Sequence, residues 1–449
     1  MSQLFGTDGI RGIANETLDC NLAYRVGQAT ALTLAKAKHG TPTVVIGKDT
    51  RISSDMLENA LLAGICSCGC NAVRLGVIPT PAVAYLTASY HADAGIVISA
   101  SHNPYEYNGI KIFSAEGFKL RDDLEDEIET LVLSKEPLPV ATHDQLGKVV
   151  DGYHASEYYI RHLASTVEDI SDLHILIDCA NGAASQTAQR LFHRFDLDVT
   201  IMNDNPDGVN INDHCGSTHL EMLSKCVKSG YYDLGIAFDG DADRCLIVDE
   251  KGREVDGDIF MAICARALRE EGKLQNNGFV ATVMSNLGLH KYCRENNLKL
   301  LCANVGDRNV LEMMQKEHMV LGGEQSGHII FLEHMTTGDG QLAALQFLQI
   351  LCRSGKTVSQ LASEFTRYPQ VLINVPTPHD NTAKRAIIDS EPVKKAIKEE
   401  TALLKGEGRI LVRPSGTESL IRVMVETSKE ETAKEIAERI STVIQSQQK

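Results

Sequence analysis

Residues 97–104 have the sequence VISASHNP, and this stretch gives the first indication of the fold. It ends a run of small and apolar residues, Ala94–Ile98, that predicts a buried strand. Pro104 cannot continue a β-ladder, and the residue before a proline is disfavoured in a helix. Ser101 should therefore lie on a sharp loop just beyond a strand end, which is where an open α/β sheet normally binds its ligand. A hydroxyl there is a candidate carrier of a transferred group, whereas a serine taken alone is more often part of a simple turn.

Three later stretches carry related chemistry. They are DGDADR at residues 239–244, GGEQSGH at residues 322–328 and RPSGT at residues 413–417. The first follows the apolar run 234–238, and the third lies between two strand-like runs, 409–412 and 420–425. Carboxylates, hydroxyls and arginine beside glycine are groups that hold metal ions, sugars and phosphates. Their combination makes a simple turn around Ser101 the less favoured interpretation.

The composition is that of a globular protein, long enough for about three domains of ~150 residues each. A formal net charge of −16 makes nucleic acid or an anionic membrane surface an unexpected partner. No run approaches the ~18 apolar residues that a membrane helix needs, and residues 1–6 lack the basic and apolar regions of a secretion signal. Twelve cysteines in such a chain suggest reduced thiols, so we expect a cytoplasmic protein.

Strand and helix patterns alternate through most of the chain and predict an α/β fold with four domains. Three α/β domains are expected at residues 1–150, 151–253 and 254–369, and a smaller α+β domain at residues 370–449. The succession of three similar patterns suggests an internal triplication, although the units share no strong residue identity. In the last domain, Ser428 and Glu431 predict a capping box at the start of a helix.

Asp239, Asp241 and Asp243 place three carboxylates within one turn after a predicted strand. Three close carboxylates are costly unless a cation neutralises them, and hard oxygen ligands on a short loop suit Mg²⁺. An EF-hand is disfavoured because it needs glycine where Arg244 stands, and helices rather than strands on both sides. Two alternatives stay open: an aspartyl phosphatase that uses the first aspartate as nucleophile, and a solvated acidic turn.

Two arginine-containing loops suit a phosphate. Arg413 with the hydroxyls of Ser415 and Thr417, and with backbone N–H groups around Gly416, forms a predicted phosphate cradle that Arg422 on the next strand can join. Near the start of the chain, the glycine-rich stretch GTDGIRG at residues 6–12 predicts a loop that brings Arg11 close to a phosphate. The alternatives are a polar hairpin for the first loop and a surface turn for the second.

Together, the four stretches VISASHNP, DGDADR, GGEQSGH and RPSGT, in this order, resemble the α-phosphohexomutase superfamily. The resemblance covers essentially the whole chain. It implies three related α/β domains and a C-terminal α+β domain around a central cleft. It assigns a phosphoserine loop to residues 1–150, a metal-binding loop to 151–253, a sugar-binding loop to 254–369 and a phosphate-binding loop to 370–449.

The resemblance also implies roles for individual residues. Ser101 would carry a phosphoryl group and act as its donor, and its phosphate would join the three aspartates as a ligand of Mg²⁺. The remaining catalytic residues would be Arg11, His102, Lys111, Arg244 and His328, and the substrate-binding residues Glu324, Ser326, Arg413, Ser415, Gly416, Thr417 and Arg422.

The acid–base pair is left open at this stage. Arginine is a poor base, so we expect Lys111 or His328 to exchange the proton, with a pKa depressed by nearby cations. His102 beside Ser101 does not indicate a hydrolase triad, because neighbouring serine and histidine side chains generally point apart. It is expected to help hold the phosphate, with simple loop packing as the alternative.

The opening FGTDGIRG stretch, from Phe5 to Gly12, and Gln325 resemble superfamily members that act on glucosamine phosphates. The implied reaction interconverts glucosamine 6-phosphate and glucosamine 1-phosphate through glucosamine 1,6-bisphosphate, and it supplies the precursor of UDP-N-acetylglucosamine. A glucose or mannose phosphomutase with the same machinery, a non-catalytic sugar-phosphate binding protein and a phosphatase are the alternatives. A phosphorylated hexosamine is thus the expected partner, and a homodimer is left open.

Overall fold

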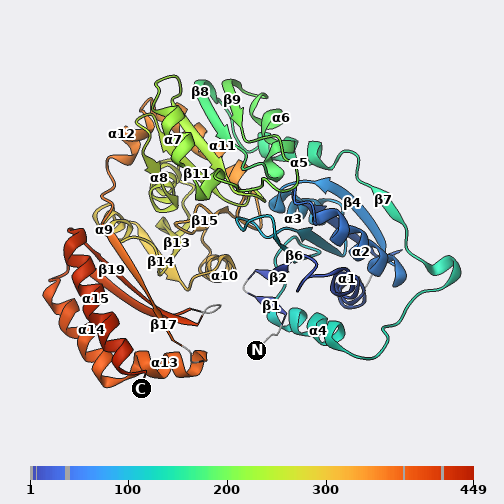
Figure 1. Ribbon diagram of the computed structural model, residues 1–449. Coiled ribbons are helices and arrows are strands. Elements are labelled where there is room, and N and C mark those ends of the chain that lie inside the picture. Colours follow the sequence, from blue (N-terminus) through green and yellow to red (C-terminus); the bar gives the residue numbers. More distant parts are fainter. Residues whose placement is uncertain (1–3, 7, 36–40, 378–379, 416–418, 449) are drawn as a thin grey trace. The chain divides into compact units, whose positions relative to one another are not determined.

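The structure is a computed structural model and describes residues 4–6, 8–35, 41–377, 380–415 and 419–448 (Figure 1). The chain forms two compact units. The first unit comprises Met1–Met284 and Lys299–Ser363, and the second comprises Ser285–Leu298 and Glu364–Lys449. Within the described ranges, no helix is both long and apolar enough to cross a membrane.

The first unit contains three sheets. The seven-stranded sheet has the order β1 (Phe5–Gly6), β2 (Gly9–Ile13), β6 (Tyr107–Ser114), β5 (Ala94–Ile98), β3 (Thr43–Lys48), β4 (Asn71–Val77) and β7 (Val149–Asp151). The five-stranded sheet has the order β12 (Glu254–Val255), β11 (Cys245–Asp249), β10 (Leu234–Phe238), β8 (Ser171–Asp178) and β9 (Asp196–Met202). The four-stranded sheet has the order β14 (Lys299–Ala303), β13 (Gly278–Thr282), β15 (Leu321–Gly323) and β16 (Ile329–Phe331).

One arrangement of four strands occurs in all three sheets. The strands β4-β3-β5-β6, β9-β8-β10-β11 and β14-β13-β15-β16 are equivalent, with three parallel strands followed by one antiparallel strand. The predicted α/β class and the internal triplication are confirmed by this topology. The boundaries predicted at residues 150, 253 and 369 stay predictions. In each repeat, the connection from the third to the fourth strand carries one of the motifs singled out above.

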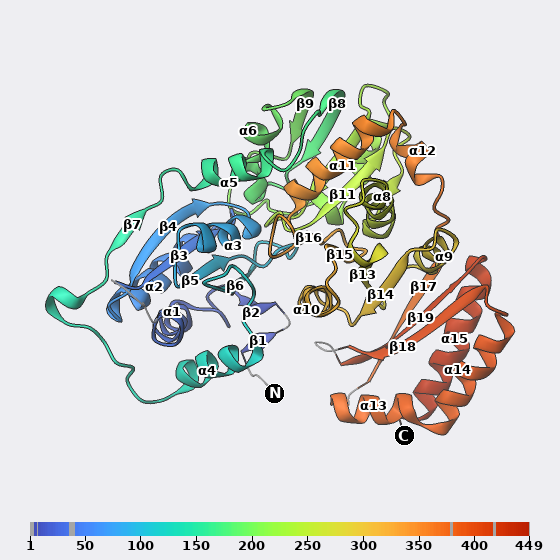
Figure 2. The same cartoon turned by 180° about the vertical axis from the view of Figure 1, so that it is seen from behind.

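Helices cover these sheets. In the first unit they are α1 (Cys20–Leu34), α2 (Ser54–Ser67), α3 (Thr80–Ser89), α4 (Asp122–Leu133), α5 (Ala155–Ala164), α6 (Ala188–Phe192), α7 (Glu221–Val227), α8 (Gly257–Glu270), α10 (Asp307–Glu317), α11 (Gly340–Ser354) and α12 (Val358–Ala362). Apolar residues of α1, α2 and α4 share a core with one face of the seven-stranded sheet, and α3 packs against its central strands (Figure 2). Helix α11 is almost wholly buried and contacts α8, β11 and β16, so it connects the second and third repeats.

Close packing of α1 on α2 depends on two glycines. A Cβ on Gly27 would lie 2.5 Å from the Leu61 carbonyl oxygen, and one on Gly64 would lie 2.2 Å from that of Tyr24. Such distances are far below van der Waals contact, so the two backbones can approach only without those side chains.

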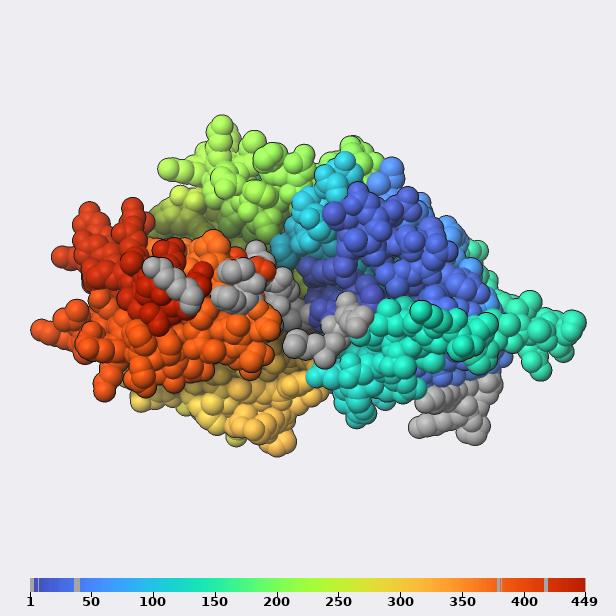
Figure 3. Space-filling model, turned by 60° about the horizontal axis from the view of Figure 1, so that its bottom comes forward, coloured from blue at the N-terminus to red at the C-terminus, as the bar shows by residue number. Residues whose placement is uncertain are grey.

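Two segments differ from the sequence-based expectation. The sequence pattern of residues 217–228 predicts a helix that ends before Gly230, but α7 begins only at Glu221. The chain first turns at Gly216 (φ 72°), where a Cβ would meet the Phe238 carbonyl oxygen. The acidic run 122–129 predicts a solvated helix face, and it does form a helix, α4, which lies at the surface beside the blue N-terminal elements in Figure 3. However, Glu129 is buried and accepts hydrogen bonds from the backbone N–H groups of Leu4 and Phe5, so it is not a solvated side chain.

The second unit is a small α+β layer. Its antiparallel sheet has the order β17 (Gln370–Pro376), β19 (Leu420–Thr427) and β18 (Gly408–Pro414), with α9 (Leu287–Glu295), α13 (Asn381–Asp389), α14 (Glu391–Leu403) and α15 (Glu430–Ser446). Apolar residues of α15, at helical spacing, pack on alternate residues of β19. The predicted capping box at Ser428 is wrong: β19 stays paired as far as Thr427, and α15 begins after Lys429 without a side-chain cap.

Candidate active site

Ser101 lies in the β5–β6 connection, in direct contact with the acidic triplet in the β10–β11 connection. Its hydroxyl donates a hydrogen bond of 2.6 Å to Asp239 Oδ2, and the side chain is buried. The residue has a φ of 53°, a left-handed conformation, and its backbone N–H donates to Ser99 Oγ at 2.9 Å. A Cβ on Gly240 would lie 2.6 Å from the Ser101 carbonyl oxygen. Glycine at this position therefore allows the two loops to meet at their backbones.

The three aspartates form a compact, buried set. One oxygen from each of Asp239, Asp241 and Asp243 lies within 4.8 Å of the others. Oδ1 of Asp241 and Oδ1 of Asp243 are buried and have no hydrogen-bond partner among the described residues. Burial, together with the charges of Asp243 and Asp241, raises the pKa of Asp239 well above its ordinary value. Three such oxygens fit a hard divalent cation, and their burial excludes a solvated acidic turn. The flanking strands β10 and β11 exclude an EF-hand.

Lys111 projects from β6 onto the same carboxylates. Its Nζ lies 2.9 Å from Asp241 Oδ2, 3.7 Å from Asp243 Oδ2 and 2.9 Å from Asp8 Oδ2. Burial lowers the pKa of Lys111, but the carboxylates of Asp241, Asp8 and Asp243 outweigh burial, and the net shift is upward. The expectation of a depressed pKa is therefore wrong for this lysine, because carboxylates rather than cations dominate its surroundings.

His328 contacts the triplet from the β15–β16 connection. Its Nδ1 lies 3.5 Å from Asp243 Oδ2, and Nε2 accepts a hydrogen bond of 3.1 Å from the Gly338 N–H. This acceptor role assigns the proton of the neutral ring to Nδ1. On protonation, the second N–H would face Asp307 Oδ2 at 3.7 Å. Burial lowers the pKa of His328, yet Asp243 and then Asp307 and Glu324 raise it overall, so the predicted depression is wrong here as well.

Three further predicted residues lie around Ser101. Arg244 Nε is 3.9 Å from Asp239 Oδ2, and the Arg244 backbone N–H donates to Asp239 Oδ1 at 3.2 Å. Arg11, on β2, pairs with Asp8 at 2.6 Å and is partly exposed. His102 Nδ1 lies 3.3 Å from Ser101 Oγ, so these neighbouring side chains meet rather than point apart. Burial and the charges of Arg244 and Arg11 lower the pKa of His102 to about 4, which leaves its imidazole neutral near pH 7.

The loop of Glu324 and Ser326 forms the β15–β16 turn. Glu324 Oε1 accepts a hydrogen bond of 3.0 Å from the Gly306 N–H, and Ser326 is half-buried in the turn. Gln325 Nε2 donates to Asp256 Oδ2 at 3.1 Å, and Asp256 is the N-cap residue of α8. The side chain of Gln325 therefore connects the β15–β16 turn to the start of α8.

In the second unit, the structure brings the predicted phosphate-binding arginines together. Arg413 and Arg422 are directly opposite each other on β18 and β19. Burial and the charge of Arg422 lower the pKa of Arg413. The sequence analysis missed Lys384, on α13, which donates to the Ser415 carbonyl oxygen at 3.3 Å. The two neighbouring guanidinium groups and the nearby ammonium group are all positively charged, so together they favour the binding of an anion. Gly416 and Thr417 lie outside the described residues.

Arg51 is a second residue that the sequence analysis missed. Its guanidinium is fully buried beside Asp49, and Nη2 donates to the carbonyl oxygens of Ser101 at 3.1 Å and Asn103 at 2.5 Å. Asn212 Nδ2 donates to the same two carbonyl oxygens at 2.9 and 3.1 Å. The Ser101 loop is thus held at its backbone by residues from two repeats. The strand-end stretch GKDTR at residues 47–51 was the available signal, since loops after parallel strands point toward ligand sites.

Replacing Arg51 by lysine should loosen this loop. A single ammonium group cannot contact Asp49 and both carbonyl oxygens at once. We expect Arg51→Lys to lower kcat about 10-fold or more and the free energy of unfolding by about 2 kcal/mol. Steady-state kinetics and urea unfolding would measure these effects. Arg74→Lys, at a partly exposed arginine that contacts Glu58, is the control and should change neither quantity appreciably. Wild-type kcat in Arg51→Lys would contradict the role of Arg51.

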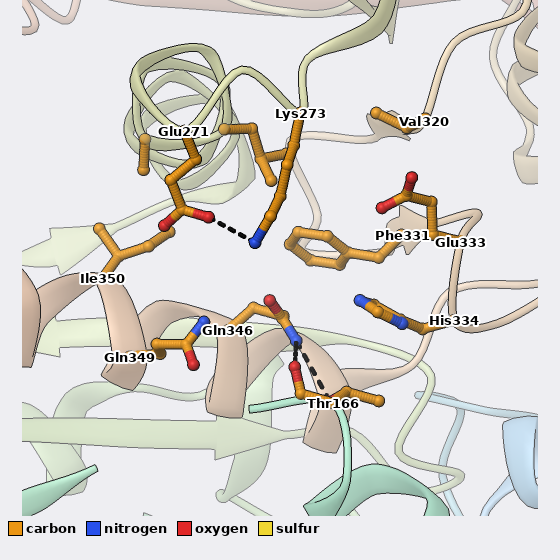
Figure 4. Close-up of a pocket in the computed structure, with 12 residues that line it drawn as sticks. Thr166, Glu271, Lys273, Val320, Phe331, Glu333, His334, Gln346, Gln349 and Ile350 are labelled. Atoms are coloured by element: carbon orange, nitrogen blue, oxygen red, sulfur yellow. Dashed lines mark hydrogen bonds and ion pairs between the residues drawn. The ribbon is translucent and has the colours of Figure 1, made fainter. Parts of the chain in front are cut away.

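Two cavities lined by described residues lie away from most of the predicted site. The pocket in Figure 4 has a volume of about 160 Å³ and lies among α8, α11 and β16, with Lys273 paired to Glu271 and Gln346 bonded to Thr166. A second cavity of about 330 Å³ is lined by His102 of the Ser101 loop and by Asn212, which hydrogen-bonds to that loop. Only His102, of the residues predicted for catalysis, lines either of them.

Comparison with known proteins accounts for this combination of repeats and motifs. Four family domains match: phosphoglucomutase/phosphomannomutase α/β/α domains I, II and III at residues 2–138, 157–252 and 256–368, and the C-terminal domain at residues 372–443. The chain belongs to the phosphoglucomutase/phosphomannomutase family. The predicted resemblance to α-phosphohexomutases is confirmed, and as a member of this family the chain is an intramolecular phosphotransferase.

Relatives and solved structures agree with this family membership. Phosphoglucosamine mutase of Clostridium acetobutylicum is 50% identical over 447 residues, which is 99% of each chain. A phosphoglucomutase/phosphomannomutase family protein from Burkholderia thailandensis has a TM-score of 0.80 at 23% identity, over 100% of this chain and 98% of its own. N-acetylphosphoglucosamine mutase of Aspergillus fumigatus was solved with GlcNAc-6P and magnesium. It has a TM-score of 0.73 at 19% identity, over 100% of this chain and 96% of its own. At these identities, the two structures establish the fold alone.

Proposed function

We propose that this phosphohexomutase interconverts glucosamine 6-phosphate and glucosamine 1-phosphate, with Ser101 as the phosphoryl carrier and glucosamine 1,6-bisphosphate as the intermediate. The observation that carries the proposal is the 2.6 Å hydrogen bond between Ser101 Oγ and Asp239 Oδ2, at the edge of a buried carboxylate triplet. The substrate assignment is supported by the 50% identity to phosphoglucosamine mutase over nearly the full chain.

Mg²⁺ is the metal that the triplet fits best. Its ligands would be Asp239, Asp241, Asp243 and an oxygen of phosphorylated Ser101. The buried Oδ1 atoms of Asp241 and Asp243, which accept no hydrogen bond from any described residue, suit that use. When bound, the ion supplies positive charge that stabilises the phosphoryl group during transfer. The chain's own residues bind the sugar, hold the donor serine still and move the proton.

In the proposed transfer, the free hydroxyl oxygen of the sugar phosphate forms a bond to phosphorus, and the bond from phosphorus to Ser101 Oγ breaks. The hydroxyl proton passes to a protein base, for which the neutral imidazole of His328 is the candidate. Lys111, whose pKa is raised by Asp241, Asp8 and Asp243, is protonated and is the candidate acid that returns a proton to Ser101 Oγ as the bisphosphate forms. The reverse transfer, from the other phosphate of the intermediate, restores phosphorylated Ser101 and releases the isomer. Arg244 and Arg11 stay positively charged and balance the phosphoryl oxygens.

Glu324 and Ser326 are proposed to bind sugar hydroxyls, since a carboxylate can accept hydrogen bonds from two adjacent hydroxyl groups. Arg413, Arg422, Ser415, Gly416 and Thr417 are proposed to hold the phosphate that is not reacting, and Lys384 joins them. Binding energy from that phosphate can orient the reacting end. A cytoplasmic location and a role in supplying the precursor of UDP-N-acetylglucosamine fit this reaction, and a homodimer stays a prediction.

A competition experiment tests the substrate. Equal concentrations of glucosamine 6-phosphate and glucose 6-phosphate are mixed with Mg²⁺, a trace of sugar bisphosphate and the protein, and phosphorus NMR follows the products. We expect glucosamine 1-phosphate to form at least about 10-fold faster than glucose 1-phosphate, a preference that one additional charged contact can supply. Faster glucose 1-phosphate formation would keep the mechanism and overturn the substrate. Inorganic phosphate as the main product would indicate a phosphatase, and no change in either sugar phosphate would indicate a binding protein.

A further inference from the structure

Six side chains, one of them Asp243 of the acidic triplet, form a closed ring in which carboxylates alternate with nitrogen-containing groups. The ring runs through Asp243, Lys111, Asp8, Lys119, Asp307 and His328, and returns to Asp243. The nitrogen–oxygen distances are 3.7 Å for Asp243–Lys111, 2.9 Å for Lys111–Asp8, 3.7 Å for Asp307–His328 and 3.5 Å for His328–Asp243. Lys119 completes the ring by hydrogen-bonding both Asp8 and Asp307.

Lys119 is placed to bridge parts of the chain that are far apart in sequence. Asp8 belongs to the β1–β2 turn, Lys119 follows β6, and Asp307 is the first residue of α10 in the third repeat. All three side chains are largely buried, with exposed fractions of 19%, 13% and 14%. The charges of Asp307 and Asp8 raise the pKa of Lys119 and outweigh the effect of burial, so the bridge is an ion pair with two carboxylates.

Each carboxylate in this bridge touches one of the two candidate proton-transfer groups. Asp8 contacts Lys111, and Asp307 lies beside Nε2 of His328. Lys119 itself makes no contact with Ser101 or with the aspartate triplet among the described residues. Any effect of Lys119 on the reaction must therefore pass through Asp8 and Asp307.

We infer that Lys119 is a positioning residue of the phosphoryl-transfer site, which fixes Lys111 and His328 together by holding Asp8 and Asp307. Without the ammonium group, the two carboxylates lose their shared partner and repel each other, and the ring opens between the first and third repeats. The groups that transfer the protons then lose their fixed geometry, to which transfer rates are very sensitive. This inference rests on the proposed function, since it uses the roles of Lys111 and His328 given there.

The test compares Lys119→Met, Lys119→Arg, Asp307→Asn and the double variant Lys119→Met/Asp307→Asn. Lys119→Met should lower kcat about 10- to 100-fold, the range seen for small misplacements of reacting groups, with KM changed less than about 3-fold. Lys119→Arg should recover part of kcat, because a guanidinium can also bridge two carboxylates. The double variant should lose less activity than the product of the single losses, because it removes a carboxylate together with its partner.

Two measurements separate this role from general damage. The half-saturating Mg²⁺ concentration and the phosphorylated fraction of Ser101, determined by intact-mass spectrometry, should match those of the wild type in Lys119→Met. Lys48→Met is the matched control, since Lys48 is equally buried and also bridges two carboxylates, Asp55 and Glu58, which touch no candidate site residue. It should lower the unfolding temperature and leave kcat unchanged.

Three outcomes would overturn the inference while the wild type remains active: wild-type kcat in Lys119→Met, strictly multiplicative losses in the double variant, or a kcat loss in Lys48→Met as large as that in Lys119→Met. A wild-type protein without mutase activity would instead overturn the proposed function. The two failures are therefore distinguishable in one set of assays.

Discussion

Ser101→Ala should abolish mutase turnover, with a loss of at least about 10⁴-fold in kcat, the size found when an attacking or donating group is removed outright. Alanine has no side-chain oxygen, so it cannot form the phosphoester that carries the phosphoryl group between the two transfers. The fold should persist, because the Ser101 loop is held through its backbone by Arg51, Asn212 and Ser99. Turnover with purified substrate and Mg²⁺ and the thermal unfolding midpoint would be measured together.

The midpoint of Ser101→Ala should change by no more than about 3 °C. Intact-mass spectrometry should also show that the variant, unlike the wild type, carries no phosphoryl group. Ser114→Ala serves as the control, because among the described residues the Ser114 hydroxyl donates only to the exposed Glu116, just beyond the end of β6. It should keep both the phosphoryl group and full activity. Substantial turnover by Ser101→Ala would refute the phosphoserine mechanism.

Asp241→Asn should weaken Mg²⁺ binding by about 100-fold, because one of three carboxylate ligands loses its charge. Activity at a Mg²⁺ concentration that saturates the wild type should fall by a similar factor. In the metal-free protein, Asp241→Asn relieves repulsion within the triplet, whose oxygens lie within 4.8 Å of one another, but it also removes the carboxylate 2.9 Å from Lys111 Nζ. These two effects oppose each other, so we expect little change in the unfolding temperature without metal.

Metal removal gives the matching measurement. A chelator should lower the unfolding temperature of the wild type, since a ligand at 100 times its Kd stabilises the folded state by about 2.7 kcal/mol. The same chelator should hardly affect Asp241→Asn. Asp178→Asn is the control, since Asp178 is a buried aspartate at the end of β8 in the same sheet, where it accepts hydrogen bonds from the Ala180 and Gly216 N–H groups. It should lose stability equally with and without Mg²⁺. An unchanged Mg²⁺ titration in Asp241→Asn would count against the metal site.

Local sequence patterns predicted the strands that carry the site. The strands at Ala94–Ile98 and Leu234–Phe238 were predicted with the bounds that the structure has, because short buried runs of apolar residues end at unmistakable turn signals. Helix starts were less predictable. At Ser428, continued pairing of β19 overrides the local capping pattern. At Gly216, a tertiary contact with the end of β10 delays the start of the predicted helix. Both competing interactions involve residues distant in sequence, which no local pattern records.

The same limit applies to the candidate site. The resemblance to the α-phosphohexomutases implied that Ser101, the aspartates and His328 would meet, and the structure brings them together. Arg51, Lys119 and Lys384 were not predicted, since their partners are backbone carbonyl groups or carboxylates from other segments. The direction of the pKa shift of Lys111 was wrong for a related reason: the sequence showed the nearby cations but not how many carboxylates would surround the lysine.

The hydrogen bonds of Arg51 and Asn212 to the backbone of the Ser101 loop bear on whether the loop or the bound sugar moves during the proposed reaction. Arg51 and Asn212 fix the same two carbonyl oxygens, and Gly240 lets the neighbouring loop close against them. The backbone that carries the serine oxygen is consequently held in place, so this loop is not built as an arm that could visit two positions on a sugar. In the proposed mechanism, exchange of the phosphates between C1 and C6 therefore comes from rotation of the bisphosphate itself. The binding residues must accordingly tolerate the hexosamine in two opposite orientations, which favours recognition of features that both orientations present alike.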